Sequence, residues 1–399
     1  MSLNSTPRAN RLHIGIFGKR NAGKSSLINA LTGQNTALVS PVAGTTTDPV
    51  YKAMELRGVG PVVFIDTAGL DDEGELGALR VEKTRQALDK TDIALVVIDG
   101  APDVEKAWIS NLKERNIPVL LVLGKVDVRE DAATLTTQLE EAFSLKVLPV
   151  SAKEGAGIEA LRAAIVESLP ADYDAVSITG DLANRGDRVL LVMPQDIQAP
   201  KGRLILPQVQ TIRELLDKGC IVTCATADQM DAALAALAGP PDLIITDSQV
   251  FPLVEQKRPP ESRFTSFSIL MAAYKGDIDQ FAKGAQAIGS LTERSRVLIA
   301  EACTHAPMEE DIGRVKIPAL LRKRVGQGLA IDFVRGADYP EDLSGYDLVI
   351  HCGACMFNRK HVLSRLAQAR RQGVPMCNYG IAIAYLTGIL DKVTLPQQG

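Results

Sequence analysis

The sequence predicts an α/β protein built from three successive units, each with a mostly parallel sheet. Short apolar runs alternate with amphipathic stretches along nearly the whole chain, as strands and helices do in parallel sheets covered on both faces. The chain has 399 residues, which is more than one ordinary domain needs. Its longest apolar runs, such as IALVVI, have the length of a strand and are too short to cross a membrane.

The first unit is expected over residues 11–170. The polar residues 1–10 before it are expected to be disordered, and the turn-rich residues 171–186 after it are expected to form a linker. Its predicted strands lie at 12–18, 62–69, 93–100, 119–127 and 146–153. Its predicted helices lie at 24–33, 77–90 and 158–169.

Two further α/β units are expected over residues 187–275 and 276–399. The strands predicted for the second unit lie at 188–194, 220–227 and 242–248, with helices at 208–219 and 230–239. The strands predicted for the third unit lie at 296–303, 329–336, 346–353 and 374–380, with helices at 317–326 and 361–373. Neither unit shows a short internal repeat.

The overall charge argues weakly against a protein that mainly binds nucleic acid. Lys plus Arg number 44 and Asp plus Glu number 48, so the net charge is −4. The polar start MSLNSTPRANR does not have the pattern of a signal peptide, and we expect a cytoplasmic protein with no membrane partner. Six cysteines in a long intracellular chain do not indicate a disulfide framework, so any redox or metal role is expected where they lie, in the second half.

A phosphate-binding loop is predicted at Gly18–Ser25, which reads G-x-x-x-x-G-K-S between a strand and a helix. The backbone N–H groups of such a loop and the N-terminus of the following helix hold phosphates. Lys24 is expected to reach the outer phosphates and Ser25 to ligate Mg²⁺. A chance glycine turn is the alternative, and the strand and helix in the right places disfavour it.

Three further motifs turn the phosphate loop into a predicted GTPase. DTAG ends the strand at 62–69, where Asp66 can hold Mg²⁺ through water and the Gly69 amide can meet the γ-phosphate. GTTTD at 44–48 is a threonine-rich loop, and SAK at 151–153 follows the last strand. With these motifs residues 11–170 resemble the TrmE–Era branch of GTPases, and the resemblance implies that Thr46 is the switch threonine on Mg²⁺.

Two positions of this GTPase depart from common patterns. Leu70 follows DTAG where other GTPases have a glutamine that orients water. Some relatives in the resembling branch use K⁺ instead, held partly by an asparagine at the position of Asn21; a loop-capping amide is the alternative for this residue. The guanine-reading motif is GKVD, with Gly124 in place of asparagine, so we expect Lys125 and Asp127 to bind guanine with weakened affinity.

The predicted nucleotide site is the union of these motifs. The residues expected to bind GTP or GDP are Gly18, Asn21, Gly23, Lys24, Ser25, Ser26, Thr46, Asp66, Gly69, Lys125, Asp127, Ser151, Ala152 and Lys153. The residues expected to act in slow hydrolysis are Lys24, Asn21, Thr46, Asp66 and Gly69, with Ser25 and Thr46 on Mg²⁺.

Cysteines and histidines follow two strands of the third unit. Cys303 and His305 come after the strand at 296–303, and His351, Cys352 and Cys355 come at the end of the strand at 346–353. Ligands bind outside the carboxyl ends of strands in open parallel sheets. We favour a 4Fe-4S cluster on the three cysteines. Three thiolates on such a cluster would leave one iron open. A histidine, a water or one of the carboxylates Glu309, Glu310 and Asp311 could fill that position.

Three other interpretations of this constellation stay open. A redox-active C-x-x-C pair leaves Cys303 and His305 unexplained. A structural zinc fits the number of ligands. Buried cysteines of a core are the third interpretation, and it is the one we adopt for Cys220 and Cys224. Cys377 and His361 are not expected to be ligands.

Over nearly its full length the chain now resembles the FeFe-hydrogenase maturation GTPases, the HydF family. The resemblance rests on the GTPase motifs, on ITDSQVF in the middle unit, and on CTH and HCGACMFNR in the last unit. It implies that residues 187–275 form a homodimer and that residues 276–399 hold the 4Fe-4S cluster. It also implies that the last unit accepts a transient diiron precursor from radical-SAM maturases and delivers it to the FeFe-hydrogenase apoprotein.

Two functions from other classes are alternatives to such a carrier. One is a GTPase regulated by redox or zinc chemistry at Cys352 and Cys355. The other is a ribosome- or tRNA-associated GTPase, which needs a basic surface facing RNA. The overall acidity disfavours the second alternative, and no nucleic-acid partner is expected.

Overall fold

The protein is described here by a computed structural model, in residues 10–33, 49–56, 58–67, 69, 82–170, 173, 176–194, 204–302, 312–336, 338–354 and 357–397. The chain divides after Tyr173 into two compact units. The disorder expected for residues 1–10 concerns a segment that lies, except for Asn10, outside the described residues.

The first unit contains a six-stranded sheet in the order β2-β3-β1-β4-β5-β6. All of its ladders are parallel except that between β2 and β3. The strands are β1 (Leu12–Gly18), β2 (Val50–Leu56), β3 (Gly60–Asp66), β4 (Ile93–Ile98), β5 (Val119–Leu123) and β6 (Val147–Pro149). The sequence predicted five of them and missed β2, an edge strand whose burial does not alternate cleanly along its length.

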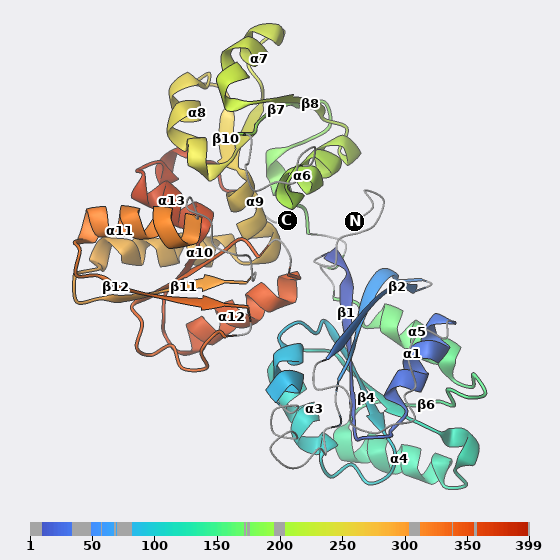
Figure 1. Ribbon diagram of the computed structural model, residues 1–399. Coiled ribbons are helices and arrows are strands. Elements are labelled where there is room, and N and C mark those ends of the chain that lie inside the picture. Colours follow the sequence, from blue (N-terminus) through green and yellow to red (C-terminus); the bar gives the residue numbers. More distant parts are fainter. Residues whose placement is uncertain are drawn as a thin grey trace. The chain divides into compact units, whose positions relative to one another are not determined.

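Helices cover both faces of this sheet (Figure 1). They include α1 (Lys24–Thr32), α3 (Glu105–Glu114), α4 (Ala132–Phe143) and α5 (Ile158–Glu167). Apolar side chains of α1 and α5 pack with β1 and β3 in one core. Those of α3 and α4 pack with β4 and β5 in a second core on the opposite face. Such double burial explains why β1 and β4 are apolar throughout.

The second unit contains two four-stranded parallel sheets, in the orders β10-β9-β7-β8 and β12-β11-β13-β14. The strands of the first are β7 (Arg188–Val192), β8 (Ile221–Ala225), β9 (Leu243–Thr246) and β10 (Arg263–Ser266). The strands of the second are β11 (Arg296–Glu301), β12 (Ala330–Arg335), β13 (Leu348–His351) and β14 (Met376–Asn378). The α/β fold class with mostly parallel sheets is therefore confirmed.

The helices of the second unit connect and cover these sheets. They are α6 (Leu206–Asp217), α7 (Met230–Ala236), α8 (Phe251–Lys257), α9 (Phe267–Lys275), α10 (Ile278–Gln286), α11 (Ile317–Val325), α12 (Arg359–Arg371) and α13 (Tyr379–Leu386). Figure 1 shows α11 and α13 on one face of the β11–β12 sheet and α12 on the other. One core includes side chains from both sheets, so the domain boundary expected near residue 276 stays a prediction.

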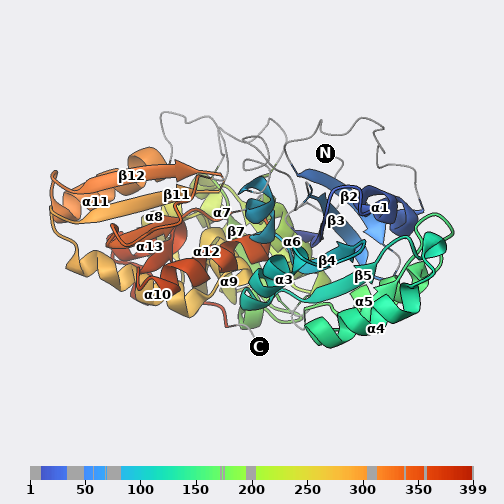
Figure 2. The same ribbon diagram turned by 90° about the horizontal axis from the view of Figure 1, so that it is seen from below.

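Helix α9 lies between the two sheets of the second unit. It follows β10 directly, contacts α6 of the first sheet, and contacts α12 and α13 of the second (Figure 2). Its first turn is capped by Ser266, whose Oγ accepts the Ile269 N–H at 3.2 Å. Its last residue is Lys275, which is 1% exposed. The helix therefore runs from β10, the edge strand of the first sheet, to a buried position beside the second sheet.

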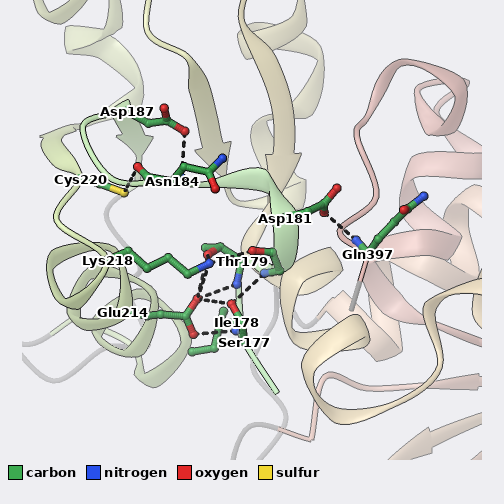
Figure 3. A network of polar contacts seen from close by, with 11 residues as sticks. Ser177, Ile178, Thr179, Asp181, Asn184, Asp187, Glu214, Lys218, Cys220 and Gln397 are labelled. Atoms are coloured by element: carbon green, nitrogen blue, oxygen red, sulfur yellow. Dashed lines mark hydrogen bonds and ion pairs between the residues drawn. The ribbon is translucent and has the colours of Figure 1, made fainter. Parts of the chain in front are cut away.

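A carboxylate of α6 holds the segment that leads into the second unit (Figure 3). Glu214 accepts hydrogen bonds from the backbone N–H groups of Ile178 at 2.6 Å and Thr179 at 2.8 Å. It also accepts the hydroxyls of Ser177 at 2.9 Å and Thr179 at 2.7 Å. Bonds to an ionised acceptor are stronger than neutral ones. Part of the predicted linker 171–186 is thus ordered structure of the second unit.

The same segment pairs with the end of the described chain. The Gln397 N–H donates to Asp181 Oδ1 at 2.8 Å, and the Asp181 N–H donates to the Gln397 carbonyl at 3.3 Å (Figure 3). Gly180 has φ +52, and a Cβ there would lie 2.4 Å from the Gln397 oxygen. The close approach therefore requires glycine at this position.

Candidate functional site

The phosphate loop lies between β1 and α1, as predicted from its motif. Gly18 has φ +149, and a Cβ on it would lie 2.4 Å from the Val97 carbonyl oxygen of β4. Asn21 and Gly23 have φ values of 61° and 93°, and Gly23 occupies the N-cap position of α1. The left-handed residues turn the chain sharply from the strand into the helix. The N–H groups of the first helical turn are therefore presented at the carboxyl edge of the sheet, where phosphates bind.

Lys24, Ser25 and Asp66 come together at this edge. The Lys24 side chain is buried, and its Nζ donates to the carbonyls of Gly18 and Lys19, both at 2.9 Å. The Ser25 hydroxyl donates to Asp66 Oδ2 at 2.8 Å, although the two residues belong to different elements. A hydroxyl and a carboxylate at this separation have the donor chemistry that Mg²⁺ prefers. The arrangement fits the Mg²⁺ site that the sequence predicts.

The switch residues are only partly described. Thr46, the rest of the loop at 44–48 and Leu70 lie outside the described residues. Thr67, which follows Asp66, is buried and donates its hydroxyl to the Ile16 carbonyl at 2.7 Å. This bond anchors the end of β3 against β1, next to the phosphate loop. Gly69 is described and half-buried, and its predicted contact with a γ-phosphate stays a prediction.

The guanine-reading motif follows β5 and includes an ion-pair network that the sequence did not indicate. Lys125 has φ 58, and its Nζ donates to Asp99 Oδ2 at 2.6 Å. Arg129 donates to the other carboxylate oxygen of Asp99 at 2.8 Å. Partial burial acts to raise the pKa of Asp99, but the hydrogen bonds from Arg129 and Lys125 outweigh it and lower the pKa. Asp99 therefore stays ionised and orients Lys125, while Asp127 lies in the short turn that follows.

Gly124 lies directly against the phosphate loop. Its N–H donates to the Ile98 carbonyl at 3.0 Å. A Cβ at this position would lie 3.2 Å from the Ala22 carbonyl oxygen, a tight but not forbidden approach. An asparagine here would thus have its amide within reach of the loop. The close packing adds a steric cost to the replacement that the motif alone does not reveal.

The SAK segment at 151–153 forms a tight turn after β6. Ser151 is fully buried, and its Oγ accepts the Glu154 N–H at 3.1 Å. Its N–H donates to the Ala156 carbonyl at 3.0 Å, and its carbonyl accepts the Gly155 N–H at 2.9 Å. Ala152 is half-buried and Lys153 is exposed. Ser151 thus shapes the turn, and the contact of this segment with guanine stays a prediction.

The second predicted site lies at the carboxyl ends of β11 and β13, which are parallel neighbours. Ala300 is paired with His351, and the Cys352 N–H donates to the Ala300 carbonyl at 2.9 Å. The Ala302 N–H in turn donates to Cys352 Sγ at 3.0 Å. Cys303 is the next residue in the chain, but it lies outside the described residues, as do His305, Cys355 and the three candidate carboxylates. Among the residues that the structure describes, no three or more His, Cys, Asp or Glu side chains come together so that they could hold a metal ion.

His351 is enclosed by partners at both ring nitrogens. Its Nδ1 lies 2.7 Å from the Cys352 carbonyl, and its Nε2 lies 2.9 Å from Arg365 Nη1 of α12. Burial first and the Arg365 charge second lower the pKa of His351 to about 3, against a raising effect of the bond to Cys352. A neutral ring that donates from Nδ1 and accepts at Nε2 fits both contacts. Ligation by His351 stays a prediction, and its contacts indicate that it positions Cys352.

No motif predicted a role for Arg365, which is 4% exposed and lies over the Tyr339 ring at 4.5 Å.

The other described cysteines differ in their surroundings. Cys377 is fully buried in β14, and burial raises the pKa of its thiol. Cys220 is buried with its thiol toward the Asn184 carbonyl, as expected of a core residue. Cys224 is exposed on β8, so the core packing expected for it is wrong.

Three family models match the chain. The model of the hydrogen maturase F dimerization domain matches residues 178–276, and that of the tetramerization domain matches residues 279–396. A model described as a 50S ribosome-binding GTPase matches residues 13–125. The chain belongs to the hydrogen maturase F (HydF) family. The first part of this HydF-family chain is a GTPase domain, which implies binding of GTP or GDP and Mg²⁺, and the two further models indicate a protein that oligomerises.

Two curated relatives are GTPases that match about two fifths of the chain. The tRNA modification GTPase MnmE of Laribacter hongkongensis is 36% identical over 162 residues, which is 40% of this chain and 35% of that protein. GTPase Der of Wolinella succinogenes is 35% identical over 167 residues, covering 39% and 35% of the two chains. The chain thus spans about a third of the length of these relatives. These relatives support GTPase activity of the first domain and carry no information on the second unit.

Solved structures give a weaker likeness. An Era variant from Aquifex aeolicus bound to GDP and AlF4⁻ is 21% identical, with a TM-score of 0.37, and covers 57% of this chain and 98% of that chain. The FeoB G-domain of Methanococcus jannaschii is 26% identical, with a TM-score of 0.30, and the match covers 40% of this chain and 97% of that chain.

No helix in the part of the chain that the structure describes is long and apolar enough to span a membrane.

The packing of Gly124 leads to a test of the altered guanine motif. Gly124→Asn should bind GDP about fivefold more tightly than Gly124→Ala, because only asparagine restores an amide hydrogen bond worth about 1 kcal/mol. Both variants place the same Cβ against the Ala22 carbonyl, so their difference isolates the amide from the steric cost. Isothermal titration calorimetry with GDP measures it. Equal affinities would show that the missing amide does not weaken binding.

Proposed function

We propose that this HydF-family protein is a GTP-hydrolysing scaffold that carries a 4Fe-4S cluster and a diiron precursor and delivers the precursor to FeFe-hydrogenase. The observation that carries the proposal is the bond from the Ala302 N–H to Cys352 Sγ in the region matched by a hydrogen maturase F model. It fits a thiolate ligand beside the end of the strand that precedes Cys303. The resident cluster and its cargo have different roles: the cluster stays, and the diiron precursor is the substrate that is handed over.

The residues present fit an iron–sulfur cluster in their donor chemistry. Thiolates bind iron, and N–H groups that donate to the cysteine sulfurs tune the reduction potential of the cluster. Cys352 already receives such a hydrogen bond from Ala302, and Cys303 and Cys355 would complete the three thiolates. The fourth position would be filled by an exchangeable group, for which His305, His351 and the carboxylates at 309–311 are the candidates. An exchangeable position is what a carrier needs and a structural site does not.

In the GTPase domain, Lys24 would neutralise the outer phosphates of GTP, and Ser25, Asp66 and Thr46 would hold Mg²⁺. Mg²⁺ would supply the charge that offsets the developing negative charge on the phosphates. Nucleotide-dependent switch segments change surface contacts between GTP and GDP states. GTP is therefore expected to govern association with the radical-SAM maturases and the hydrogenase apoprotein, and not the chemistry of the cluster itself.

Oligomerisation through the middle region has a candidate surface. β8 is an edge strand of its sheet, so its outer backbone groups are open to pairing. Ile221 on β8 is 59% exposed, and Leu216, near the end of α6, is 56% exposed. An apolar edge of this kind favours pairing with a second copy of the chain. We infer that the homodimer forms along β8, which lies within the match to the dimerization-domain model.

Potassium stimulation should depend on Asn21. GTP turnover should be faster in KCl than in NaCl at equal ionic strength, because K⁺ would supply the positive charge that an arginine finger supplies in other GTPases. Asn21→Gly should lose this difference while keeping the loop, since glycine adopts the φ of 61° without strain. Phosphate release measured in both salts for both proteins tests the role. Equal turnover of the native protein in the two salts would rule out potassium.

The cluster can be tested with serine variants. Anaerobically reconstituted native protein should be brown and contain iron and sulfide in equal amounts, and Cys352→Ser should lose both, because the serine hydroxyl is a poor ligand for iron. Cys224→Ser is the matched control, since this thiol is exposed on β8, which belongs to the other sheet of the second unit. The functional readout is activation of immature hydrogenase by cargo-loaded protein.

Full activation by Cys352→Ser would overturn the carrier proposal. A colourless native protein that binds zinc, or one whose cysteines cycle between thiol and disulfide, would instead support a zinc- or redox-regulated GTPase.

The dimer surface can be tested with Ile221→Lys. A charge on an edge strand opposes pairing with another copy, so the mass in solution should fall by half. Val166→Lys is the control, because Val166 is a comparably apolar residue, 39% exposed, on α5 of the GTPase domain. Light scattering of both variants gives the masses. An unchanged mass for Ile221→Lys would place the interface elsewhere.

A further inference from the structure

The loop between β13 and α12 is held by a buried lysine from another part of the chain. Lys275, the last residue of α9, is 1% exposed. Its Nζ donates to the Ala354 carbonyl at 3.0 Å and to the Phe357 carbonyl at 2.6 Å. These two residues lie on either side of Cys355. Lysine is almost never fully buried without partners, so the contact points to a specific role for this side chain.

The loop that Lys275 holds has a constrained shape. Ala354 is buried and has φ 46, a left-handed conformation that costs energy for a residue with a Cβ. Its carbonyl accepts the Phe357 N–H at 3.0 Å as well as the Lys275 ammonium. The Phe357 ring stacks on His361 of α12 at 4.6 Å. The strained Ala354 is thus held by two hydrogen bonds to its carbonyl, one of which comes from the Lys275 ammonium.

Lys275 also ties this turn to the rest of the second unit. Helix α9 is capped by Ser266, whose hydroxyl oxygen lies 3.3 Å from that of Ser248 and 3.1 Å from that of Ser268. The helix thus starts from hydroxyl contacts at the end of β10 and ends at the cysteine loop. It belongs to the stretch matched by the dimerization-domain model, whereas the loop belongs to the stretch matched by the tetramerization-domain model.

We propose that Lys275 is a positioning residue for the iron–sulfur cluster: it holds the carbonyls of Ala354 and Phe357, which flank Cys355 in the sequence, and places a positive charge beside them. The inference rests on the proposed cluster site. A cluster with thiolate ligands gains negative charge when it accepts an electron, and a nearby ammonium in a region of low dielectric favours that state. Lys275 therefore sets both the retention of the cluster and its reduction potential.

The test uses the full chain with three substitutions at one position. Lys275→Met removes the hydrogen bonds and the charge, Lys275→Gln keeps a donor without charge, and Lys275→Arg keeps the charge. Lys283→Met is the control, because Lys283 is an exposed lysine on the next helix, α10. Circular dichroism first establishes that each variant is folded.

Two readouts concern the cluster itself. Lys275→Met should lose iron to a chelator several-fold faster than the native protein. Its midpoint potential, followed by electron paramagnetic resonance during titration with dithionite, should shift to more negative values. Lys275→Arg should restore the potential. Lys275→Gln should retain iron better than Lys275→Met yet share its negative shift, which separates the charge from the hydrogen bonds and still tests the proposal if the Met variant does not fold.

A third readout uses the protein without iron. Alkylation of Cys352 and Cys355, resolved by peptide mass spectrometry, should be several-fold faster in Lys275→Met and unchanged in Lys283→Met, because the turn loses its anchor. If native protein and Lys275→Met bind the cluster with equal retention and equal potential, the inference is wrong while the proposed function stands. If the native protein binds no cluster, the proposed function fails, and the alkylation rates alone decide whether Lys275 holds the turn.

Discussion

The parallel ladder between β11 and β13 is the constraint on which the second candidate site depends. Parallel pairing brings the carboxyl ends of both strands to one edge of the sheet. The register that pairs Ala300 with His351 then sets Cys352 Sγ 3.0 Å from the Ala302 nitrogen, one residue before Cys303. A shift of one residue would turn every side chain of β13 to the opposite face. The bond from the Cys352 N–H to the Ala300 carbonyl belongs to this register, so the ladder fixes the position of the cysteine.

The same constraint operates in the GTPase domain, and buried lysines complete both sites. Lys24 donates to carbonyls of the loop after β1, and Lys275 donates to carbonyls of the loop after β13. In each case an ammonium stabilises an irregular turn at the carboxyl edge of a parallel sheet. The two lysines differ in origin. Lys24 belongs to the helix that its own loop begins, whereas Lys275 comes from a helix of the neighbouring sheet.

Local patterns predicted the features that depend on neighbouring residues. The phosphate loop, Asp66 and the buried strands each have a signature within a few positions, and the structure brings Lys24, Ser25 and Asp66 together. Contacts between distant residues had no such signature. Lys275 meets Ala354 across a separation of 79 positions, and Asp99 meets Lys125 across 26. Edge strand β2 was missed because its half-exposed residues lack clear alternation. Cys224 is exposed on β8, which is an edge strand of its sheet. The order of the strands in the sheet could not be predicted from the local sequence.

The hydrogen bonds between Asp181 and Gln397 bring the two ends of the second unit together. The chain enters this unit and reaches its last described residues at the same place, so the polypeptide forms a nearly closed ring. A short connection could join the two ends without disturbing either sheet, and the unit would then tolerate new termini in an exposed loop, as circular permutation requires. A domain fused after residue 397 would likewise emerge beside the segment that Glu214 holds, and not at the cysteine loop.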